Sequence, residues 1–481
     1  MQSTIIRTQA YVDGQWVSAA SGKTLAVTNP ATGEHLADVP DMSAEEAAAA
    51  VEAADRAFDS WKKTTAKSRA QLLRRWYELI MDNQEALAQL MTAEQGKPLA
   101  ESRGEVAYGA SFAEWFGEEA KRTYGEQIPS PSPTSRLVTI RQPVGVVAAI
   151  TPWNFPVAMI TRKVAPALAA GCTVVLKPAE DTPLCALALM ALAEEAGFPA
   201  GVINMVTTAD PIAVGDTLTS HPLVRKVSFT GSTPVGKHIL HQAADTVKKV
   251  SLELGGNAPF IVFDDADLDA AVKGVLISKY RNAGQTCVCT NRVYVQRSVM
   301  EQFVAKFSEL VAALKVGPGD QEGVEIGPLI NRKAIERVEQ VVSHAVGEGA
   351  QLLLGGARSE VGELFYQPTL LGGIDESMAI ANQELFGPIS TLFVFDDEEE
   401  VIERANATPF GLAAYFYSRD IGRCWRVAEG LEYGMVGINE CILSNEVAPF
   451  GGVKESGTGR EGSRHGIEDY LEIKYLCMGG I

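Results

Sequence analysis

The chain has 481 residues, of which 46% are hydrophobic and 21% are charged, and its net charge is −18 at pH 7. A globular protein of about two to four domains fits this composition, and such a chain buries a sufficient core without disulfides or a structural metal. An acidic surface repels nucleic-acid phosphates and anionic lipid, which argues against both as partners, although arginines inside a pocket can still bind a small anion.

The N-terminal segment, residues 1–23, has no apolar run typical of a secretion signal. No uncharged apolar stretch reaches the length of about 18 residues that a membrane span needs. The seven cysteines are scattered along the chain and odd in number, unlike a disulfide framework, and no His/Cys spacing indicates a metal site. These features favour a reduced, cytoplasmic protein.

Helices are predicted near the N-terminus. Ser43 and Glu46 form a capping box before an alanine-rich amphipathic run. A second helix is predicted from about Ala66 to Glu94, because apolar residues recur there at helical spacing. The segment Gln127–Ser135 is the richest in proline and serine, which predicts an exposed connection.

From Leu137 onward, short apolar runs alternate with helical stretches, and the pattern resumes after Glu253. Buried strands between helices predict parallel sheets, so we expect two α/β units side by side. The C-terminal segment 465–481 ends in an alternating run, which predicts an exposed edge strand that a neighbouring subunit covers. The predicted buried strands lie at 143–151, 172–177, 224–230, 259–263, 292–296 and 390–395.

Two glycine-rich segments resemble nucleotide-binding motifs. Gly457–Gly462 matches GxGxxG, but its flanks read as loop, whereas the dinucleotide fingerprint needs a strand before it and a helix after it. Gly231–Lys237 is close to a P-loop, but His238 stands where that loop needs Ser or Thr to hold magnesium, which argues against a P-loop kinase. A strand-to-helix turn at Gly231 and Ser232 still offers backbone N–H groups to a pyrophosphate.

Three residues have the chemistry of a catalytic site. Cys287 follows a polar, turn-forming run, which predicts a loop or helix N-terminus where the dipole lowers the thiol pKa; a buried structural cysteine is the alternative. Glu253 lies at the end of an apolar strand. An acidic residue there is either a general base with a raised pKa or an ion-paired carboxylate. Asn154 lies in a proline-fixed loop at a strand end, where its amide can donate to an oxyanion.

Six short motifs, taken in their order along the chain, resemble those of the aldehyde dehydrogenase superfamily. The resemblance extends from about Ala10 to the C-terminus, and it implies two doubly wound α/β domains and a small β oligomerisation element. The cofactor domain, which is Rossmann-like, would comprise residues 1–119 and 141–252. The catalytic domain would comprise residues 253–450, and the oligomerisation element residues 120–140 and 451–481. The motifs are WNFP (153–156), KPAE (177–180), FTGS (229–232), ELGG (253–256), GQTC (284–287) and ELFGP (384–388).

The resemblance implies a catalytic role for each matching residue. Cys287 would attack the aldehyde carbon, and the Asn154 amide with the Cys287 backbone N–H would hold the oxyanion. Glu253 would activate the water that hydrolyses the thioester. Lys163 and Glu461 fall where the family often has a proton-relay pair. A catalytically inactive structural relative is disfavoured, because the nucleophile, base and amide are all present.

The resemblance also implies an NAD(P) site. A carboxylate at Glu180 binds both ribose hydroxyls but repels a 2′-phosphate, which favours NAD over NADP. Lys177 would join it at the adenosine ribose, and Glu384 would contact the nicotinamide ribose beside Phe386. The remaining residues expected at the cofactor are Thr151, Pro152, Trp153, Gly231 and Ser232.

Segments 153–183, 281–289 and 444–463 resemble the succinate-semialdehyde dehydrogenase branch. That branch implies that Arg162, Arg281 and Ser444 bind the distal carboxylate, for which an Arg fork is well suited. Glutarate semialdehyde stays open, because one methylene changes binding by only about 1–3 kcal/mol. A broader aldehyde dehydrogenase also stays open, and we expect a homodimer or homotetramer in either case.

Cys289, two residues after Cys287, departs from most of the superfamily but occurs in this branch. It suggests the hypothesis that oxidation joins Cys287 to Cys289 and switches the enzyme off. The alternative is a packing residue without a redox role.

Overall fold

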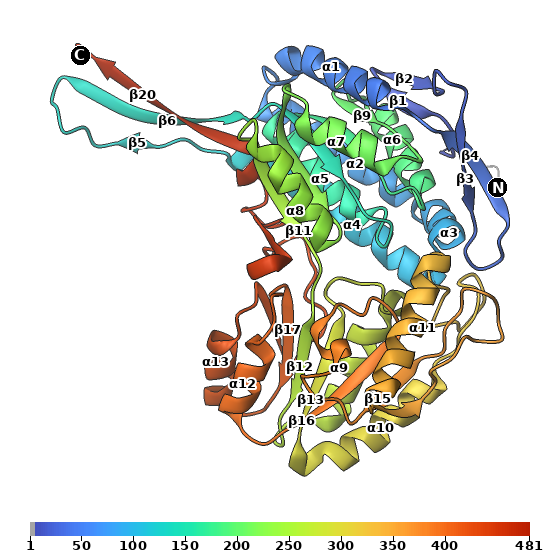
Figure 1. Cartoon of the computed structure of the whole chain (residues 1–481). Coiled ribbons are helices and arrows are strands. Elements are labelled where there is room, and N and C mark those ends of the chain that lie inside the picture. The colour runs from blue at the N-terminus through green and yellow to red at the C-terminus, as the bar shows by residue number, and fades with distance from the viewer. Residues whose placement is uncertain (1–4) are drawn as a thin grey trace.

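The structure, a computed structural model, describes residues 5–481, and its N-terminal part begins with two β-hairpins followed by helices (Figure 1). The predicted capping box is confirmed: Ser43 N donates to Glu46 Oε2 at 2.8 Å, and Glu46 N donates to Ser43 Oγ at 3.3 Å. The hairpins are β1 (Ala10–Val12) with β2 (Gln15–Val17) and β3 (Thr24–Thr28) with β4 (His35–Pro40); the helices are α1 (Ala44–Trp61), α2 (Ala66–Asp82), α3 (Gln84–Gln95) and α4 (Leu99–Glu119).

The single helix expected from Ala66 to Glu94 is wrong, because the chain forms two helices there. Asn83, with φ −106° and ψ 17°, separates α2 from α3, and its side-chain amide donates to the Leu79 carbonyl at 2.9 Å. An asparagine that bonds a nearby carbonyl competes with the helical ladder, which explains the break.

An eight-stranded sheet forms the upper lobe, in the order β19-β11-β10-β7-β8-β9-β1-β2. Its central strands are parallel, and the order reverses between β7 and β10, so their carboxyl ends open a crevice where α/β proteins bind ligands. The strands are β7 (Val146–Ile150), β8 (Thr173–Lys177), β9 (Ile203–Met205), β10 (Val224–Thr230), β11 (Lys249–Glu253) and β19 (Gly457–Thr458); the helices are α5 (Ala158–Ala170), α6 (Pro183–Ala196), α7 (Pro211–Ser220) and α8 (Thr233–Ala244).

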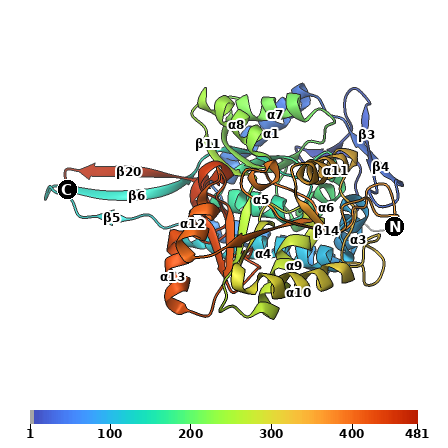
Figure 2. The same cartoon turned by 60° about the horizontal axis from the view of Figure 1, so that its bottom comes forward.

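A seven-stranded sheet forms the lower lobe, in the order β14-β15-β16-β13-β12-β17-β18 (Figures 1 and 2). All neighbouring strands in this sheet are parallel except β14 and β15, which pair antiparallel. The four strands β16, β13, β12 and β17 are deeply buried. The strands are β12 (Ala258–Val262), β13 (Thr290–Gln296), β14 (Gln351–Leu354), β15 (Thr369–Gly372), β16 (Ile389–Phe395), β17 (Ala413–Tyr417) and β18 (Met435–Ile438). The helices are α9 (Leu268–Tyr280), α10 (Met300–Ala313), α11 (Arg332–Gly347), α12 (Glu398–Asn406) and α13 (Ile421–Gly430).

A three-stranded arm, β20-β6-β5, projects from the body of the molecule (Figures 1 and 2). The predicted C-terminal strand is confirmed as β20 (Leu471–Gly479), which pairs antiparallel with β6 (Ser135–Pro143); β5 (Gln127–Ile128) pairs with the other edge of β6. Apolar side chains along the arm are exposed, among them Ile473 and Tyr475. Separately, no described helix combines the length and apolar character that crossing a membrane requires.

Candidate active site

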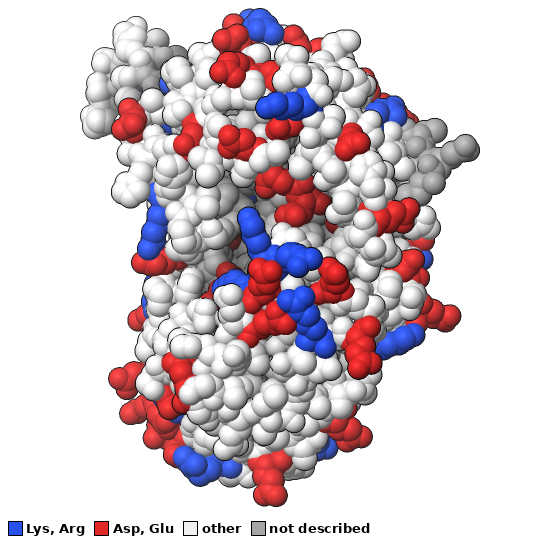
Figure 3. Space-filling model, turned by 45° about the vertical axis from the view of Figure 1, so that its right-hand side comes forward, with Lys and Arg blue, Asp and Glu red and all other residues white. Residues whose placement is uncertain are grey.

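The residues singled out in the sequence converge at the junction of the two lobes. Figure 3 shows a hollow at this junction, bordered by both basic and acidic side chains. From the upper lobe come the loop after β7, the end of β11 and helix α5. The lower lobe contributes the loop between α9 and β13, which contains Cys287.

The loop that leads to Cys287 has an unusual backbone. Asn282 and Ala283 both have positive φ, 52° and 54°, which L-residues rarely adopt. The conformation is held from outside: Asn282 N donates to Glu101 Oε2 at 2.8 Å, and Gln95 Nε2 donates to Asn282 Oδ1 at 3.0 Å. Strain of this kind persists only where surrounding contacts over-determine it, so the Cys287 loop is pre-shaped.

Cys287 is partly exposed, but its thiol is not activated by a helix. A turn follows the cysteine and leads into strand β13, so the expected lowering of its pKa by a helix dipole is wrong. Burial among apolar neighbours raises the pKa of Cys287 to about 12; Arg162 lowers it, and Glu384 and Glu253 raise it further. The nearby arginine, rather than backbone dipoles, is therefore the main group favouring the thiolate.

Asn154 is held directly against the Cys287 loop. Its Nδ2 donates to the Gln285 carbonyl at 3.0 Å, and its own backbone carbonyl accepts from Lys97 Nζ at 2.7 Å and Asn282 Nδ2 at 3.0 Å. An amide group has two N–H donors, so one remains after the bond to Gln285. The predicted proximity of the Asn154 amide to the cysteine loop is thus present.

Glu253, at the end of β11, is a buried carboxylate without a hydrogen-bond partner on either oxygen. Burial raises its pKa well above the usual range, and the charge of Glu461 raises it further, against opposing effects of Arg162 and Lys163. Within residues 5–481 it forms no ion pair. The expectation of a raised pKa is confirmed, and the carboxyl group is suited to accept a proton.

Arg162 and Lys163, consecutive residues of α5, both pair with Glu461. Arg162 Nε lies 2.5 Å from Glu461 Oε2, and Lys163 Nζ pairs with Oε1. Burial lowers the pKa of Lys163, whereas Glu461 raises the pKa of Arg162 despite burial. Burial disfavours charge on Glu461, but Lys163 and Arg162 leave its pKa below the usual range. The residues expected to serve as relay and as substrate anchor therefore form one ion cluster.

Both candidate substrate arginines lie against aromatic rings. The Arg162 Cζ is 4.1 Å from the Phe450 ring centroid, and the Arg281 Cζ is 5.3 Å from that of Phe155. Burial raises the pKa of Tyr108, and both arginines lower it, so this phenol lies near each of them. The third expected anchor, Ser444, is half-buried in the loop after β18.

The three aromatic residues were not singled out in the sequence. Phe155 lies inside the WNFP motif and Phe450 directly before a Gly-Gly pair, so each had a signal nearby. Tyr108 lies in the middle of α4 without any distinguishing motif.

The crevice between β7 and β10 has polar groups that fit a dinucleotide. The hydroxyls of Thr151 and Thr230, at the ends of these neighbouring strands, are buried without partners. Ser232 is the N-cap of α8, but its side chain makes no capping bond, so the first N–H groups of the helix stay available for a phosphate. By contrast, the GxGxxG match forms β19 at Gly457–Thr458, an antiparallel edge strand without a following helix.

Other expected cofactor residues surround this crevice. Lys177 and Glu180 form an ion pair with each other. Glu384 accepts from Gly256 N at 3.1 Å, and burial raises its pKa to about 7. The rings of Trp153 and Phe386 meet edge to face with centroids 5.6 Å apart. In addition, Gly231 and Pro152 lie in the loops after β10 and β7. The residues present therefore fit a dinucleotide.

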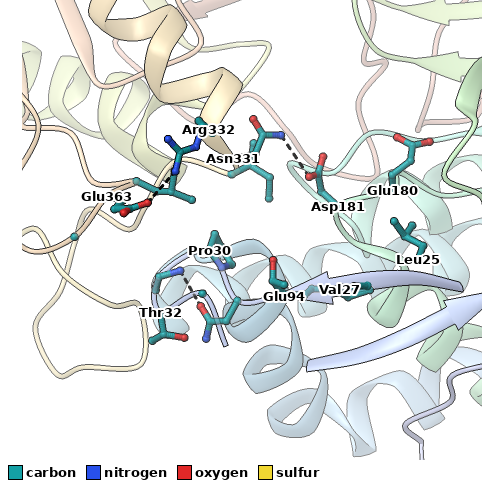
Figure 4. Close-up of a pocket in the computed structure, with 18 residues that line it drawn as sticks. Leu25, Val27, Pro30, Thr32, Glu94, Glu180, Asp181, Asn331, Arg332 and Glu363 are labelled. Carbon is teal, nitrogen blue, oxygen red and sulfur yellow. Dashed lines mark hydrogen bonds and ion pairs between the residues drawn. The ribbon is translucent and has the colours of Figure 1, made fainter. Parts of the chain in front are cut away.

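A cavity of about 600 Å³ adjoins the expected adenosine end of this site (Figure 4). It lies between strand β3 and the start of α11, and Glu180 and Asp181 belong to its lining. Across it, Asn331 Nδ2 lies 3.4 Å from Asp181 Oδ1, and Arg332 pairs with Glu363. Of its lining, the sequence motifs pointed only to Glu180, because the walls of the cavity come from distant segments.

The chain belongs to the aldehyde dehydrogenase family, whose profile it matches over residues 16–476. It is 61% identical to a 3-sulfolactaldehyde dehydrogenase of Pseudomonas putida, covering 99% of this chain and 98% of that protein. It is 60% identical to a glutarate-semialdehyde dehydrogenase of Pseudomonas aeruginosa and 58% identical to an NADP⁺-dependent succinate-semialdehyde dehydrogenase of Escherichia coli; each alignment covers 99% of both chains.

Solved structures agree with this assignment. The structure of a succinate-semialdehyde dehydrogenase from Burkholderia pseudomallei superposes with a TM-score of 0.98 at 57% identity, over 100% of this chain and 99% of the other. The predicted family and fold class, two α/β units with a small β element, are confirmed.

Proposed function

We propose that this chain oxidises a small aldehyde with a distal anionic group, succinate semialdehyde first, to the corresponding acid with NAD(P) as oxidant. The observation that carries the proposal is the pair of arginines, Arg162 and Arg281, which lie against the rings of Phe450 and Phe155 and whose charges both act on the thiol of Cys287. A carboxylate bound by such a pair places an aldehyde a few bonds away next to the nucleophile.

In the first half of the reaction, the partly exposed Cys287 thiol loses its proton to solvent water, and the sulfur attacks the aldehyde carbon. The carbonyl oxygen becomes an oxyanion, which accepts hydrogen bonds from Asn154 Nδ2 and the Cys287 backbone N–H. When bound, the oxidised nicotinamide supplies the acceptor for the two electrons and the hydrogen that leave the thiohemiacetal carbon. The carbonyl then re-forms as a thioester on Cys287.

In the second half, Glu253 accepts a proton from water while the water oxygen attacks the thioester carbon. The carbon–sulfur bond breaks, and the acid and the free cysteine result. The raised pKa of Glu253 makes it a stronger base than an exposed carboxylate. Glu461 and Lys163 form an ion pair that can pass the proton on, since the charge of Glu461 acts on Glu253.

The cofactor residues support the use of both NAD and NADP. Glu180 alone would repel a 2′-phosphate, as the sequence suggested. Its ion pair with Lys177 places a positive charge beside that carboxylate, and the Lys177 ammonium can form an ion pair with a 2′-phosphate. The Escherichia coli relative is named for NADP⁺. Glu180→Gln is expected to raise the kcat/KM ratio of NADP over NAD.

Two other anionic aldehydes are supported by the similar proteins. Glutarate semialdehyde differs by one methylene, and 3-sulfolactaldehyde carries a sulfonate, another anionic group that can accept hydrogen bonds from a pair of arginines. Initial rates with these two, succinate semialdehyde and butanal separate the alternatives. Strong preference for the anionic aldehydes, lost in Arg162→Ala and Arg281→Ala, would support the proposal; equal rates with butanal would contradict it.

The oligomeric state and the cellular location of the protein belong to the same proposal. The exposed apolar side chains of the β5–β6–β20 arm favour a homodimer or homotetramer, since an uncovered strand edge of this kind promotes association. A cytoplasmic location fits the scattered, unpaired cysteines.

The Cys287–Cys289 disulfide also remains a hypothesis. Cys289 is buried with Lys279 Nζ 3.3 Å from its sulfur. If hydrogen peroxide inactivated the wild type and Cys289→Ala equally, and dithiothreitol restored neither, the hypothesis would be wrong.

A further inference from the structure

Lys97 and Glu105 form an ion pair that is closed off from solvent at the corner between α3 and α4. Their side chains are 0% and 1% exposed. Removing two charges from water is costly, so a buried pair contributes little to stability by itself unless its remaining polar atoms are also used. Both residues have such further partners, and all of these lie in the segment 154–158.

Lys97 contacts the residue proposed as the oxyanion donor. Its Nζ donates to the backbone carbonyl of Asn154 at 2.7 Å and lies 4.0 Å from the ring centroid of Phe155. The same carbonyl accepts from Asn282 Nδ2 at 3.0 Å. A carbonyl oxygen has two lone pairs, so both are used. The peptide plane after Asn154 is therefore fixed, and with it the direction in which the Asn154 side chain leaves the backbone.

Glu105 holds the other end of the same segment. Its Oε1 accepts from Val157 N at 2.9 Å and from Ala158 N at 3.3 Å, where α5 begins. The first N–H groups of a helix have no partner within the helix, and a carboxylate there is favoured by the helix dipole. The ion pair thus clamps the oxyanion loop at one end and the helix with Arg162 and Lys163 at the other.

The corner that contains Lys97 is itself rigid. Gly96 has φ 94°, and a Cβ at this position would lie 2.5 Å from Pro328 Cγ, so only glycine fits the turn. Lys97 N donates to Gln95 Oε1 at 3.0 Å, and Gln95 Nε2 donates to Asn282 Oδ1 at 3.0 Å. The corner therefore fixes the Asn154 loop and the Cys287 loop together.

We propose that Lys97 is a positioning residue for the oxidation step, acting through the backbone carbonyl of Asn154, with Glu105 as its counter-ion. The inference rests on the proposed role of Asn154 as oxyanion donor. Lys97 touches none of the reacting atoms. Its contribution is to hold the Asn154 amide in place before the oxyanion forms, so that no reorganisation is needed at that moment.

The test is a double-mutant cycle between Asn154→Ala and the neutralised pair Lys97→Met/Glu105→Gln, measured as the single-turnover rate of cofactor reduction. Both charges are removed together, because Lys97→Met alone would leave Glu105 uncompensated and threaten folding.

Asn154→Ala is expected to slow the step by about 10²–10³-fold. The neutralised pair is expected to slow it by about tenfold or more, as misplacement of a catalytic group does, with KM nearly unchanged. In the Asn154→Ala background, the neutralised pair should slow it no further.

A matched control separates positioning from general destabilisation. Lys226→Met removes another buried lysine, which bonds Ser251 and lies over the Tyr470 ring, and its effect should be the same in both backgrounds.

Two results would overturn the inference in distinguishable ways. If the neutralised pair slowed the Asn154→Ala enzyme by the same factor as the wild type, Lys97 would act independently of Asn154. If Asn154→Ala kept the wild-type rate, the proposed oxyanion role itself would be wrong.

Discussion

The two walls of the active site are built in different ways. The upper wall, formed by β11, α5 and the segment before β20, brings together buried ionisable groups: Arg162, Lys163, Glu461 and the unpartnered Glu253. The lower wall, the loop 281–289, has one charged side chain, Arg281, and is held mainly by neutral amide contacts and left-handed backbone. The upper wall is therefore defined by interactions between ionisable groups, and the lower wall by hydrogen bonds and backbone conformation.

The difference explains how the nucleophile is controlled. The thiol of Cys287 belongs to the lower wall. Burial is the largest cause of its pKa shift, and the charged groups that come next, led by Arg162, lie mainly in other segments. The loop fixes where the sulfur lies, and the ion cluster across the crevice sets how readily it ionises. Changes on the upper wall should therefore alter pH dependence, whereas changes at the uncharged residues of the lower wall should alter rate without moving the pH profile.

The largest effect is expected for the nucleophile. Cys287→Ser should lower kcat by about 10⁴-fold or more, because removal of a covalent nucleophile leaves only binding and oxyanion stabilisation. Cys289→Ser, on the same loop, should keep most of the activity. Steady-state kinetics with succinate semialdehyde measure both. Comparable losses in the two variants would contradict the assignment of the nucleophile.

Glu253→Gln should lower kcat by about 10²–10⁴-fold, because a general base is lost. The burst of cofactor reduction should remain, since the base is needed only for thioester hydrolysis. In the wild type, the raised pKa keeps Glu253 protonated at low pH, so deacylation should accelerate as pH rises through that pKa. Stopped-flow measurements should find this rise abolished in Glu253→Gln; loss of the burst would argue against the assigned step.

Arg162→Leu removes the upper-wall cation that favours the thiolate. The pKa of Cys287 is about 12, so alkylation by iodoacetamide should accelerate with pH across the neutral and alkaline range without a plateau near neutrality. Loss of the Arg162 charge raises that pKa further. The variant should therefore react several-fold more slowly at each pH, because a thiol with a higher pKa is ionised to a smaller extent. Ala283→Gly on the lower wall should leave the pH profile in place.

Glu461→Gln breaks the ion cluster while keeping Arg162. The released guanidinium gains donors for a substrate carboxylate, so KM for succinate semialdehyde should fall by a few-fold, whereas kcat should fall by about 10-fold or more if proton transfer is impaired. Butanal, which lacks the carboxylate, serves as the control substrate and should show the loss in kcat without the gain in KM. A fall in KM for both aldehydes would mean that Glu461 does not restrain Arg162.

The smallest effect is expected for Ala283→Gly. Relief of the strained φ of 54° and the extra freedom of glycine in the unfolded chain oppose each other, so the free energy of unfolding should change by less than about 1 kcal/mol. Ala283→Val, a β-branched residue at the same buried position, should be clearly destabilising by comparison. Denaturant unfolding compares the two. Strong stabilisation of the glycine variant would mean that the loop stores more strain than its contacts suggest.

The sequence predicted what depends on local pattern. Buried strands such as Val224–Thr230 and the capping box at Ser43 follow from apolar runs and helix-end chemistry, and the ordered motifs identified the family. The sequence could not predict contacts made by folding. Arg162 and Glu461 are far apart in the chain and meet only because α5 and the segment before β20 pack together.

Two predictions failed, one for a local reason and one for a reason that involves the whole fold. The break at Asn83 depends on a side-chain bond to one carbonyl, which helical periodicity does not register. The thiol of Cys287 has a raised pKa because burial outweighs any local dipole, and burial is a property of the whole fold. Tyr108 was missed because a single tyrosine in a helix has no signature until the arginines lie beside it.

The most direct test of the account is mass spectrometry of Glu253→Gln after mixing with succinate semialdehyde and NADP. Because hydrolysis is blocked while oxidation is not, the peptide that contains Cys287 should gain the mass of one succinyl group, in step with cofactor reduction. Cofactor reduction without acylation of Cys287, or acylation at another cysteine, would contradict the covalent mechanism on which the account depends.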